Sequence, residues 1–346
     1  MFGGTRLCSF AFLVGIASSL PATVTAQALD RTHFIRLAAS VVKVEVQNRN
    51  GSYSLGTAVA IAPGRVVTNC HVTRDARLIT LVKGALRWPA IAQSADLEHD
   101  LCILEAPTLE AMPVRMGSAR SLRIGQRVGA MGFTGGIGMA FRDGMVGALH
   151  RLDGSKVIQS TTAFTSGASG GALFDNEGRL VGILTFRLPG APGYYFSAPV
   201  DWVAARVTAV EGFTGIAPLA ATRPFWQHPP PDLPYFMRAA LLEAGDQWPE
   251  LLKLADAWAV AEDDSPEPWI TRGKAYLRLD RREAAAEAFS RATVVEPASG
   301  DAWFNLGVTC FHLGEMAELQ RAHLTLSHLN PDLAKDLAVI AGLSIQ

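Results

Sequence analysis

The pattern of apolar residues changes near residue 212, and this change constrains the fold of the 346-residue chain more than any other feature. Between residues 35 and 205, short alternating or apolar runs such as VVKVEV and RLVGILTF are separated by Gly, Pro, Asp and Asn. Many short strands with regular turns are typical of β-sandwiches and β-barrels rather than of βαβ units. After residue 212 the chain becomes rich in Ala, Leu and Glu with helical periodicity. We therefore predict a multidomain protein, all-β in its first part and all-α in its second.

The helical part contains an internal repeat with a period of 34 residues, seen in three pairs of identical residues: Trp269 and Trp303, Gly273 and Gly307, Pro297 and Pro331. This period is that of the tetratricopeptide repeat, a helix–turn–helix unit. One copy fits the repeat pattern at these positions: Trp269, Gly273, Tyr276, Ala285, Phe289, Ala292 and Pro297. We predict a tetratricopeptide-repeat domain over residues 232–346, with a degenerate first copy at 232–265 and a capping helix at 333–346. Residues 212–231, rich in Pro and Gly, are predicted to be a linker.

The composition and the N-terminal residues indicate where the protein is located and which classes of partner it does not bind. The formal net charge is −1, which excludes binding of nucleic acid through a basic surface, and an apolar content of 49% excludes a disordered chain. Arg6, an apolar stretch, Pro21 and the small residues before Gln27 predict a signal peptide over residues 1–26, with an uncleaved anchor as the alternative. We expect an exported protein, periplasmic or secreted, that has no stable membrane span after cleavage.

Three short segments carry residue types that together support nucleophilic catalysis: VVTNCHV with His71, HDLCIL with Asp100, and TSGASGGAL with Ser169. A serine hydroxyl needs a neutral imidazole to take its proton, and a carboxylate to hold that imidazole in the right tautomer. The oxyanion that develops needs preorganised N–H donors, which the amides of Gly167 and Ser169 would supply. Gly167 suits this place because glycine adopts the required backbone conformation without penalty. Asp96 is the rival carboxylate to Asp100.

In chain order, His, Asp and Ser follow the order of chymotrypsin and not that of the α/β-hydrolases. Residues 35–205 resemble a trypsin-like serine protease of the HtrA/Deg type, on stretches that include GTAVAIAPGRVVTNCHV, HDLCILEA and IQSTTAFTSGASGGALFDNEGRLVGI. The resemblance implies a chymotrypsin-like double β-barrel over residues 30–211, two packed six-stranded barrels with the triad between them. It also implies a role in envelope protein quality control. The sequence departs from the family because residues 211–346 show no PDZ-like pattern and the loops of the first barrel are short, which puts trimerisation in doubt.

The substrate pocket is predicted from positions around the nucleophile. Ala163 stands six residues before Ser169, where trypsin-type pockets place a selecting acid, and Phe164 follows it. A buried Lys or Arg of the substrate would have no partner there, so we expect a small or medium apolar residue before the cleaved bond. Another wall of the pocket is expected from the residues just after the strand that follows Ser169, namely Leu184, Thr185 and Phe186.

The remaining cysteines leave two alternatives open. In the resembling fold the strands that carry Cys70 and Cys102 are neighbours, so a disulfide between them and two buried free thiols are equally compatible with the sequence. Cys70, His71, His99 and Cys102 also have the residue types of a zinc site, but a metal would occupy the imidazole needed as base. We expect no metal and no cofactor.

Two functions from different classes follow. The first is an exported serine endopeptidase that acts through His71, Asp100 and Ser169 and an acyl-enzyme intermediate, with a polypeptide substrate. Its repeat domain would bind a protein or peptide on its concave face. The alternative is a catalytically silent or latent scaffold that uses the protease fold as a binding module.

Overall fold

The computed structural model describes residues 31–135, 138–188, 193–207 and 212–343 of the chain. The predicted signal peptide at 1–26 lies outside these residues. None of the helices in the described ranges combines the length and the apolar character needed to cross a membrane.

The short apolar runs of the first part form strands, as predicted. In β1 (Val41–Asn48) buried residues alternate with half-buried ones, because successive side chains of a strand point to opposite faces. The long strand β9 (Gly138–Leu152) has mostly half-buried and exposed residues, and the apolar pattern did not predict it. The other strands before residue 208 are β2 (Tyr53–Ala62), β3 (Arg65–Asn69), β4 (Ala76–Lys83), β5 (Leu86–Pro89), β6 (Ala92–Asp96), β7 (Leu101–Glu105), β8 (Arg127–Thr134), β10 (Ser155–Ser160), β11 (Ala172–Asp175), β12 (Leu180–Arg187) and β13 (Tyr195–Pro199).

These strands form two units. The first is an eight-stranded sheet in the order β14-β6-β7-β3-β2-β1-β4-β5, which includes the two-residue strand β14 (Thr214–Gly215). The second is a closed barrel in the order β10-β13-β12-β11-β8-β9. The second unit has the six strands expected, whereas the first has eight because β5 and β14 extend the two ends of its strand order. Short helices accompany them: α1 (Arg31–Ala38), α2 (Cys70–Thr73), α3 (Val200–Val207) and the 3-10 turn η1 (Ala119–Ser121).

A shared hydrophobic core joins the two units. Val59 and Ile103 of the first sheet pack in one buried cluster with Met131, Phe174 and Ile183 of the barrel. All five are almost completely buried. Because this cluster fixes the sheet against the barrel, residues at strand ends along the seam are held in constant relation to one another.

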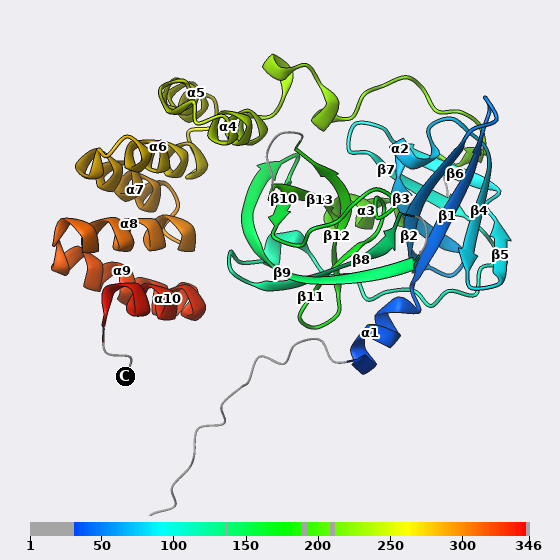
Figure 1. Cartoon of the computed structure of the whole chain (residues 1–346), viewed down its shortest axis with the longest axis horizontal. Coiled ribbons are helices and arrows are strands. Elements are labelled where there is room, and N and C mark those ends of the chain that lie inside the picture. Colours follow the sequence, from blue (N-terminus) through cyan, green and yellow to red (C-terminus); the bar gives the residue numbers. More distant parts are fainter. Residues whose placement is uncertain (1–30, 136–137, 189–192, 208–211, 344–346) are drawn as a thin grey trace, which may run out of the picture.

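The second part of the chain is helical, so the predicted order of an all-β part followed by an all-α part is confirmed. Three pairs of antiparallel helices are followed by a last helix, and the helices lie side by side in a stack (Figure 1). The helices are α4 (Tyr235–Ala244), α5 (Trp248–Ala261), α6 (Glu267–Arg278), α7 (Arg282–Val295), α8 (Gly300–Leu313), α9 (Met316–Leu329) and α10 (Pro331–Ala341).

The repeat stack sits against the closed barrel, on the side away from the eight-stranded sheet (Figure 1). Phe236 of α4 packs in one buried cluster with Phe186 and Phe196 of the barrel. Glu267 of α6 bonds to the imidazole of His150 in β9, with 2.7 Å between Oε2 and Nδ1. A cavity of about 310 Å³ remains between the barrel and the repeats. The inner face of the repeats is thus partly occupied by the barrel of the same chain.

The segment predicted as a linker is packed along the β units rather than free. Its first part pairs with β6 through β14, and the side-chain amide of Gln93 donates to the carbonyl of Ala217 at 2.7 Å. Farther on, the amide of Phe225 donates to the carbonyl of Glu98 at 3.0 Å. Two 3-10 turns, η2 (Phe225–Gln227) and η3 (Pro230–Asp232), lead into α4. In Figure 1 the segment runs along the top of the molecule from β6 to α4.

Candidate active site

His71 and Asp100 form a directly bonded pair on the first sheet. His71 lies in the one-turn helix α2, immediately after β3, and its side chain is 26% exposed. Its Nδ1 is 2.6 Å from Oδ2 of Asp100, and its backbone amide donates to Oδ1 of the same carboxylate at 2.8 Å. The Asp100 side chain is completely buried. Two bonds to one residue therefore fix both the position and the ring orientation of the imidazole.

The backbone of Asp100 explains how its carboxylate reaches this place. Asp100 ends the turn before β7 with a φ of +58°, in the left-handed region that Asp tolerates better than most residues. Its carbonyl accepts from the amide of Cys70 at 3.2 Å and from the side chain of the buried Asn69 at 2.9 Å. These bonds tie the turn to the end of β3, so the carboxylate faces the start of α2.

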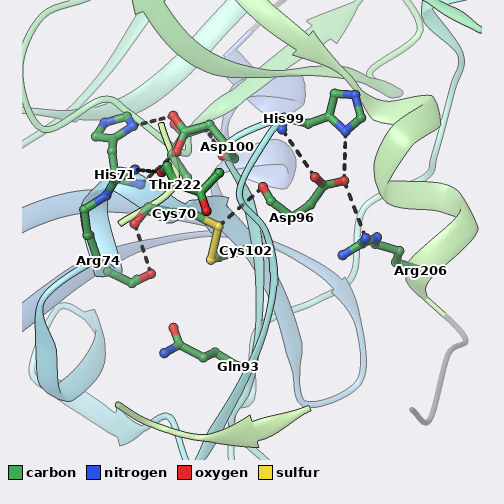
Figure 2. Close-up of a disulfide and its surroundings, with 12 residues drawn as sticks. Cys70, His71, Arg74, Gln93, Asp96, His99, Asp100, Cys102, Arg206 and Thr222 are labelled. Carbon is green, nitrogen blue, oxygen red and sulfur yellow. Dashed lines mark hydrogen bonds and ion pairs between the residues drawn. A yellow bond between two sulfur atoms is a disulfide. The ribbon is translucent and has the colours of Figure 1, made fainter. Parts of the chain in front are cut away.

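A disulfide also links the start of α2 to β7. Cys70 directly precedes His71, Cys102 lies two residues after Asp100, and their sulfurs are joined with the Cα atoms 4.9 Å apart (Figure 2). The pairing of β3 with β7 sets Thr68 opposite Cys102. The structure thus selects the disulfide from the two alternatives, and neither sulfur is left free as a zinc ligand.

Asp96, the rival carboxylate, is bonded elsewhere. Its Oδ2 is 2.9 Å from Nδ1 of His99 and 3.6 Å from the guanidinium of Arg206 (Figure 2). The other nitrogen of His99 bonds to Asp153 at 2.9 Å. Of the two candidate acids, Asp100 is the one that contacts His71.

Ser169 lies in a tight turn between β10 and β11 that is bonded to the first sheet. The carbonyl of Ser169 accepts from the amide of Thr57 at 2.8 Å, and the carbonyl of Gly167 accepts from the Thr57 hydroxyl at 2.7 Å. Gly170 has a φ of +82°, and a side chain there would collide with the carbonyl of Thr57 and the hydroxyl of Thr68. The turn is therefore pressed against β2 and β3, next to the helix that carries His71.

The turn leaves two amides free for a substrate oxygen. Within the described ranges neither the Gly167 amide nor the Ser169 amide has a backbone or side-chain acceptor. The carbonyl of Ser166 accepts from the amide of Gly135 at 2.8 Å, and Gly167 has a φ of +90°. Because C=O and N–H point in opposite directions across a trans peptide, the bond to Gly135 directs the Gly167 N–H away from Gly135.

The predicted base His71 and the predicted nucleophile Ser169, which is half-buried, are not joined by a hydrogen bond between their side chains in the described residues. Such contacts are often long in free enzymes and shorten when a substrate is bound.

The predicted pocket residues separate into two groups. Ala163, Phe164 and Leu184 line a cavity of about 170 Å³ whose wall also includes Ala130, Gly132, Thr134, Ala140, Arg142, Thr165 and Ala168. Thr185 is instead buried, and its hydroxyl accepts from the side chain of Asn69 at 3.2 Å. Phe186 stacks on Trp226, with 5.2 Å between ring centroids. The cavity wall is mostly apolar, with the exposed Arg142 as its charged residue.

Trp226 contacts both His71 and Asp100, and the sequence did not predict this contact. Its indole N–H donates to Oδ2 of Asp100 at 3.3 Å, and its ring meets the His71 ring edge to face at 5.7 Å. It belongs to the segment between the two domains that the sequence predicts to be a linker. The one available signal was a pair of large aromatic residues, Phe225 and Trp226, within a Pro-rich stretch.

Comparison with known families agrees with this geometry. Residues 56–183 match the family model described as "Trypsin-like peptidase domain", a range that contains His71, Asp100 and Ser169. Over these residues the chain is similar to trypsin-like peptidase domains. Residues 270–318 match the family described as "Tetratricopeptide repeat".

Relatives of the trypsin-like peptidase domain include curated proteases. The chain is 33% identical over 164 residues to "Protease Do-like 1, chloroplastic" of Arabidopsis thaliana, which covers 43% of this chain and 37% of that protein. It is 29% identical over 157 residues to the "Probable periplasmic serine endoprotease DegP-like" of Halomonas elongata, and this match covers 43% of this chain and 33% of that protein. Among solved structures, "HtrA-type protease AlgW with tripeptide" is 28% identical with a TM-score of 0.46, and the match covers 49% of this chain and 60% of that one. The chain spans about a third of the length of these curated relatives.

Proposed function

We propose that the chain is a serine endopeptidase that cleaves polypeptides through Ser169, His71 and Asp100. The observation that carries this proposal is the buried carboxylate of Asp100, bonded to both Nδ1 and the amide of His71, next to a serine turn with two unpaired amides. The relatives named as serine endoproteases support the same reaction. Acyl transfer needs a nucleophile, an oriented base and oxyanion donors, and this site contains all three.

In the first half of the proposed reaction, the Ser169 hydroxyl attacks the carbonyl carbon of the peptide bond while Nε2 of His71 takes its proton. Asp100 holds the proton on Nδ1 and stabilises the imidazolium that forms. The amides of Gly167 and Ser169 donate to the oxyanion of the tetrahedral intermediate. His71 then gives its proton to the leaving amine, and the acyl group stays on Ser169.

In the second half, water takes the place of the leaving amine. Nε2 of His71 removes a proton from this water, whose oxygen attacks the acyl carbon. The amides of Gly167 and Ser169 again donate hydrogen bonds to the oxyanion of the tetrahedral intermediate. When it collapses, the bond to Ser169 breaks and the hydroxyl regains its proton from His71, so the enzyme returns to its starting state.

For specificity, we propose that the cavity beside Ala163, Phe164 and Leu184 takes a small or medium apolar side chain. A volume of about 170 Å³ suits such a group. A cationic substrate side chain would meet Arg142 and no carboxylate among the residues that line this cavity.

We further propose export to the periplasm or outside the cell, with residues 1–26 as signal peptide. Two observations support this. The Cys70–Cys102 disulfide is a bond that persists in oxidising compartments, and a relative is named as a periplasmic endoprotease. The repeats indicate protein partners, and part of their inner surface is already used to dock the barrel.

Labelling of the full chain with a fluorophosphonate tests the proposed chemistry. Ser169→Ala should abolish labelling, and His71→Ala should slow it by at least a thousandfold, because the hydroxyl then has no base. Ser121→Ala, which removes an exposed hydroxyl in another loop, is the matched control and should label like the wild type. Folded wild-type protein that is not labelled would instead favour a latent or non-catalytic scaffold.

A further inference from the structure

Trp226 reaches the His71–Asp100 pair from outside the trypsin-like peptidase domain. Its indole N–H donates to Oδ2 of Asp100, the same oxygen that bonds His71, and its ring meets the imidazole edge to face. The Phe186 ring stacks on the Trp226 ring, with an angle of 5° between the two planes. One side chain therefore touches both members of the pair and the strand beside them.

The bonding of the buried carboxylate shows why this contact matters. Oδ1 of Asp100 accepts from the His71 amide, and Oδ2 accepts from His71 Nδ1 and from Trp226. Among the described side chains, Trp226 is the one donor to this carboxylate besides His71. A completely buried carboxylate is costly unless donors surround it, so the indole N–H supplies a hydrogen bond that this carboxylate needs.

The neighbouring polar side chains do not donate to Oδ2 of Asp100, because they have other hydrogen-bond partners. The Thr185 hydroxyl donates to the carbonyl of Ile183 at 2.7 Å and accepts from Asn69. The Asn69 amide reaches the backbone carbonyl of Asp100 and not its carboxylate. The place next to Oδ2 is therefore left to Trp226.

The position of Trp226 is fixed from both domains. The preceding residue, Phe225, is 4% exposed and its amide donates to the Glu98 carbonyl. Beyond Trp226, Phe186 stacks on Phe196 with 4.8 Å between ring centroids. The Phe196 ring in turn contacts the tilted ring of Phe236 in the first repeat helix at 5.9 Å. Contacts on the barrel and on the repeat domain thus hold the indole in place.

We propose that Trp226 is a positioning residue for the His71–Asp100 pair, supplied by the segment that joins the peptidase and repeat domains. This rests on the proposed function, because the pair matters only if His71 acts as the base. Trp226 keeps water from the hydrogen bond between Asp100 and His71 and completes the bonding of the carboxylate. The rival reading, that Trp226 is a plug that obstructs the cleft, predicts the opposite effect on rate.

The test compares Trp226→Phe with wild type in the full chain. Phenylalanine keeps an aromatic ring that can stack on Phe186, but it lacks the N–H donor and one of the two fused rings of the indole. We expect labelling of Ser169 and kcat for a peptide substrate to fall about tenfold, with KM changed less than twofold. Trp303→Phe is the matched control, since it also removes a hydrogen-bonded indole N–H, in this case one that donates to the Pro297 carbonyl within the repeats, and it should change neither.

A second readout does not depend on catalysis. The proton between His71 Nδ1 and Asp100 should give a low-field NMR resonance that is absent in His71→Ala, and Trp226→Phe should broaden it through faster exchange with water. If wild type fails to label, the proposed function fails, while this resonance still decides the role of Trp226. The proposal would be overturned if this proton exchanged with water at the same rate in Trp226→Phe as in wild type. It would also be overturned if Trp226→Phe were labelled faster than wild type, because Trp226 would then obstruct the cleft.

Discussion

At the scale of single residues, Thr57 links the first sheet to the nucleophile turn. Its hydroxyl donates to the Gly167 carbonyl at 2.7 Å and accepts from the Phe133 amide at 2.9 Å, and its own amide donates to the Ser169 carbonyl. Thr57 is completely buried. The orientation of the two free amides therefore depends on a side chain of another strand.

We expect Thr57→Val to disturb this turn. The isosteric change leaves the Gly167 carbonyl and the Phe133 amide without their partner, which should cost about 1–3 kcal/mol of unfolding free energy. Ser169 labelling should fall roughly tenfold, which is less than the hundredfold to thousandfold typical for the loss of an oxyanion donor, because both amides remain. Thr57→Ser keeps the hydroxyl and is the control; labelling at the same rate in both variants would contradict the assignment. Urea denaturation and labelling kinetics provide the two measurements.

The same scale shows what a sequence can predict of this site. His71, Asp100 and Ser169 stand in short segments whose residue types and order are distinctive in themselves. Thr57 and Trp226 are ordinary residues in a strand and in a Pro-rich stretch, and their contacts arise only when distant segments meet. Thr185 and Phe186 were predicted as pocket walls from their distance to Ser169, but neither lines the cavity, because Thr185 faces Asn69 and Phe186 faces Trp226.

At the scale of elements, the turn before β7 is bridged to the turn between β9 and β10. His99 bonds Asp96 at 2.9 Å and Asp153 at 2.9 Å, while Arg206 of α3 lies 3.6 Å from Asp96 and the Trp202 ring lies 4.0 Å from the imidazole. Burial opposes the charging of His99, but the hydrogen bonds that its ring donates to Asp96 and Asp153 outweigh burial and raise the pKa of His99. Burial also opposes the charging of Asp96, yet bonding to His99 and the charges of His99 and Arg206 lower its pKa.

This bridge should make stability depend on pH. A raised His99 pKa gives a contribution that is complete below the unfolded value of about 6.5 and is lost as pH rises through the folded value. A lowered Asp96 pKa gives one that is present above about 3.8 and is lost as pH falls. We expect His99→Asn to cost about 1 kcal/mol more at pH 5.5 than at pH 8.5, measured by urea unfolding of both proteins. Equal costs at the two pH values would show that the bridge carries no charge.

Elements also differ in how well the sequence predicts them. Strands such as β1 and β12 have one or both faces buried and show it in their apolar pattern. β9 was not predicted, because its residues are mostly half-buried or exposed and it is held by pairing with β8 and β10 rather than by a core of its own. The helical repeats were predicted from their period, since each pair of helices packs mainly on the neighbouring pairs.

At the scale of the whole molecule, the two domains share polar and apolar contacts. Glu267 at the start of α6 bonds His150 and accepts from the Arg151 amide at 3.0 Å, and the Arg151 guanidinium bonds Glu296 at 2.7 Å. Phe236 stacks on His150 with 4.3 Å between ring centroids. Neither the period of the repeats nor the strand pattern predicts this docking, because it depends on contacts between residues that are far apart in the sequence.

Because the buried cluster around Phe186, Phe196 and Phe236 contains residues of both domains, we expect the chain to unfold in a single calorimetric transition. Glu267→Ala removes the acceptor of His150 and of the Arg151 amide, which should weaken docking by about 2–5 kcal/mol and separate an earlier transition of the repeats from that of the barrel. Glu283→Ala is the matched control, because Glu283 is also an acid in the first turn of a repeat helix but is exposed. If both variants lower the first transition equally, the loss comes from the helix terminus and not from the interface, and the repeats are then an independent unit tethered to the peptidase.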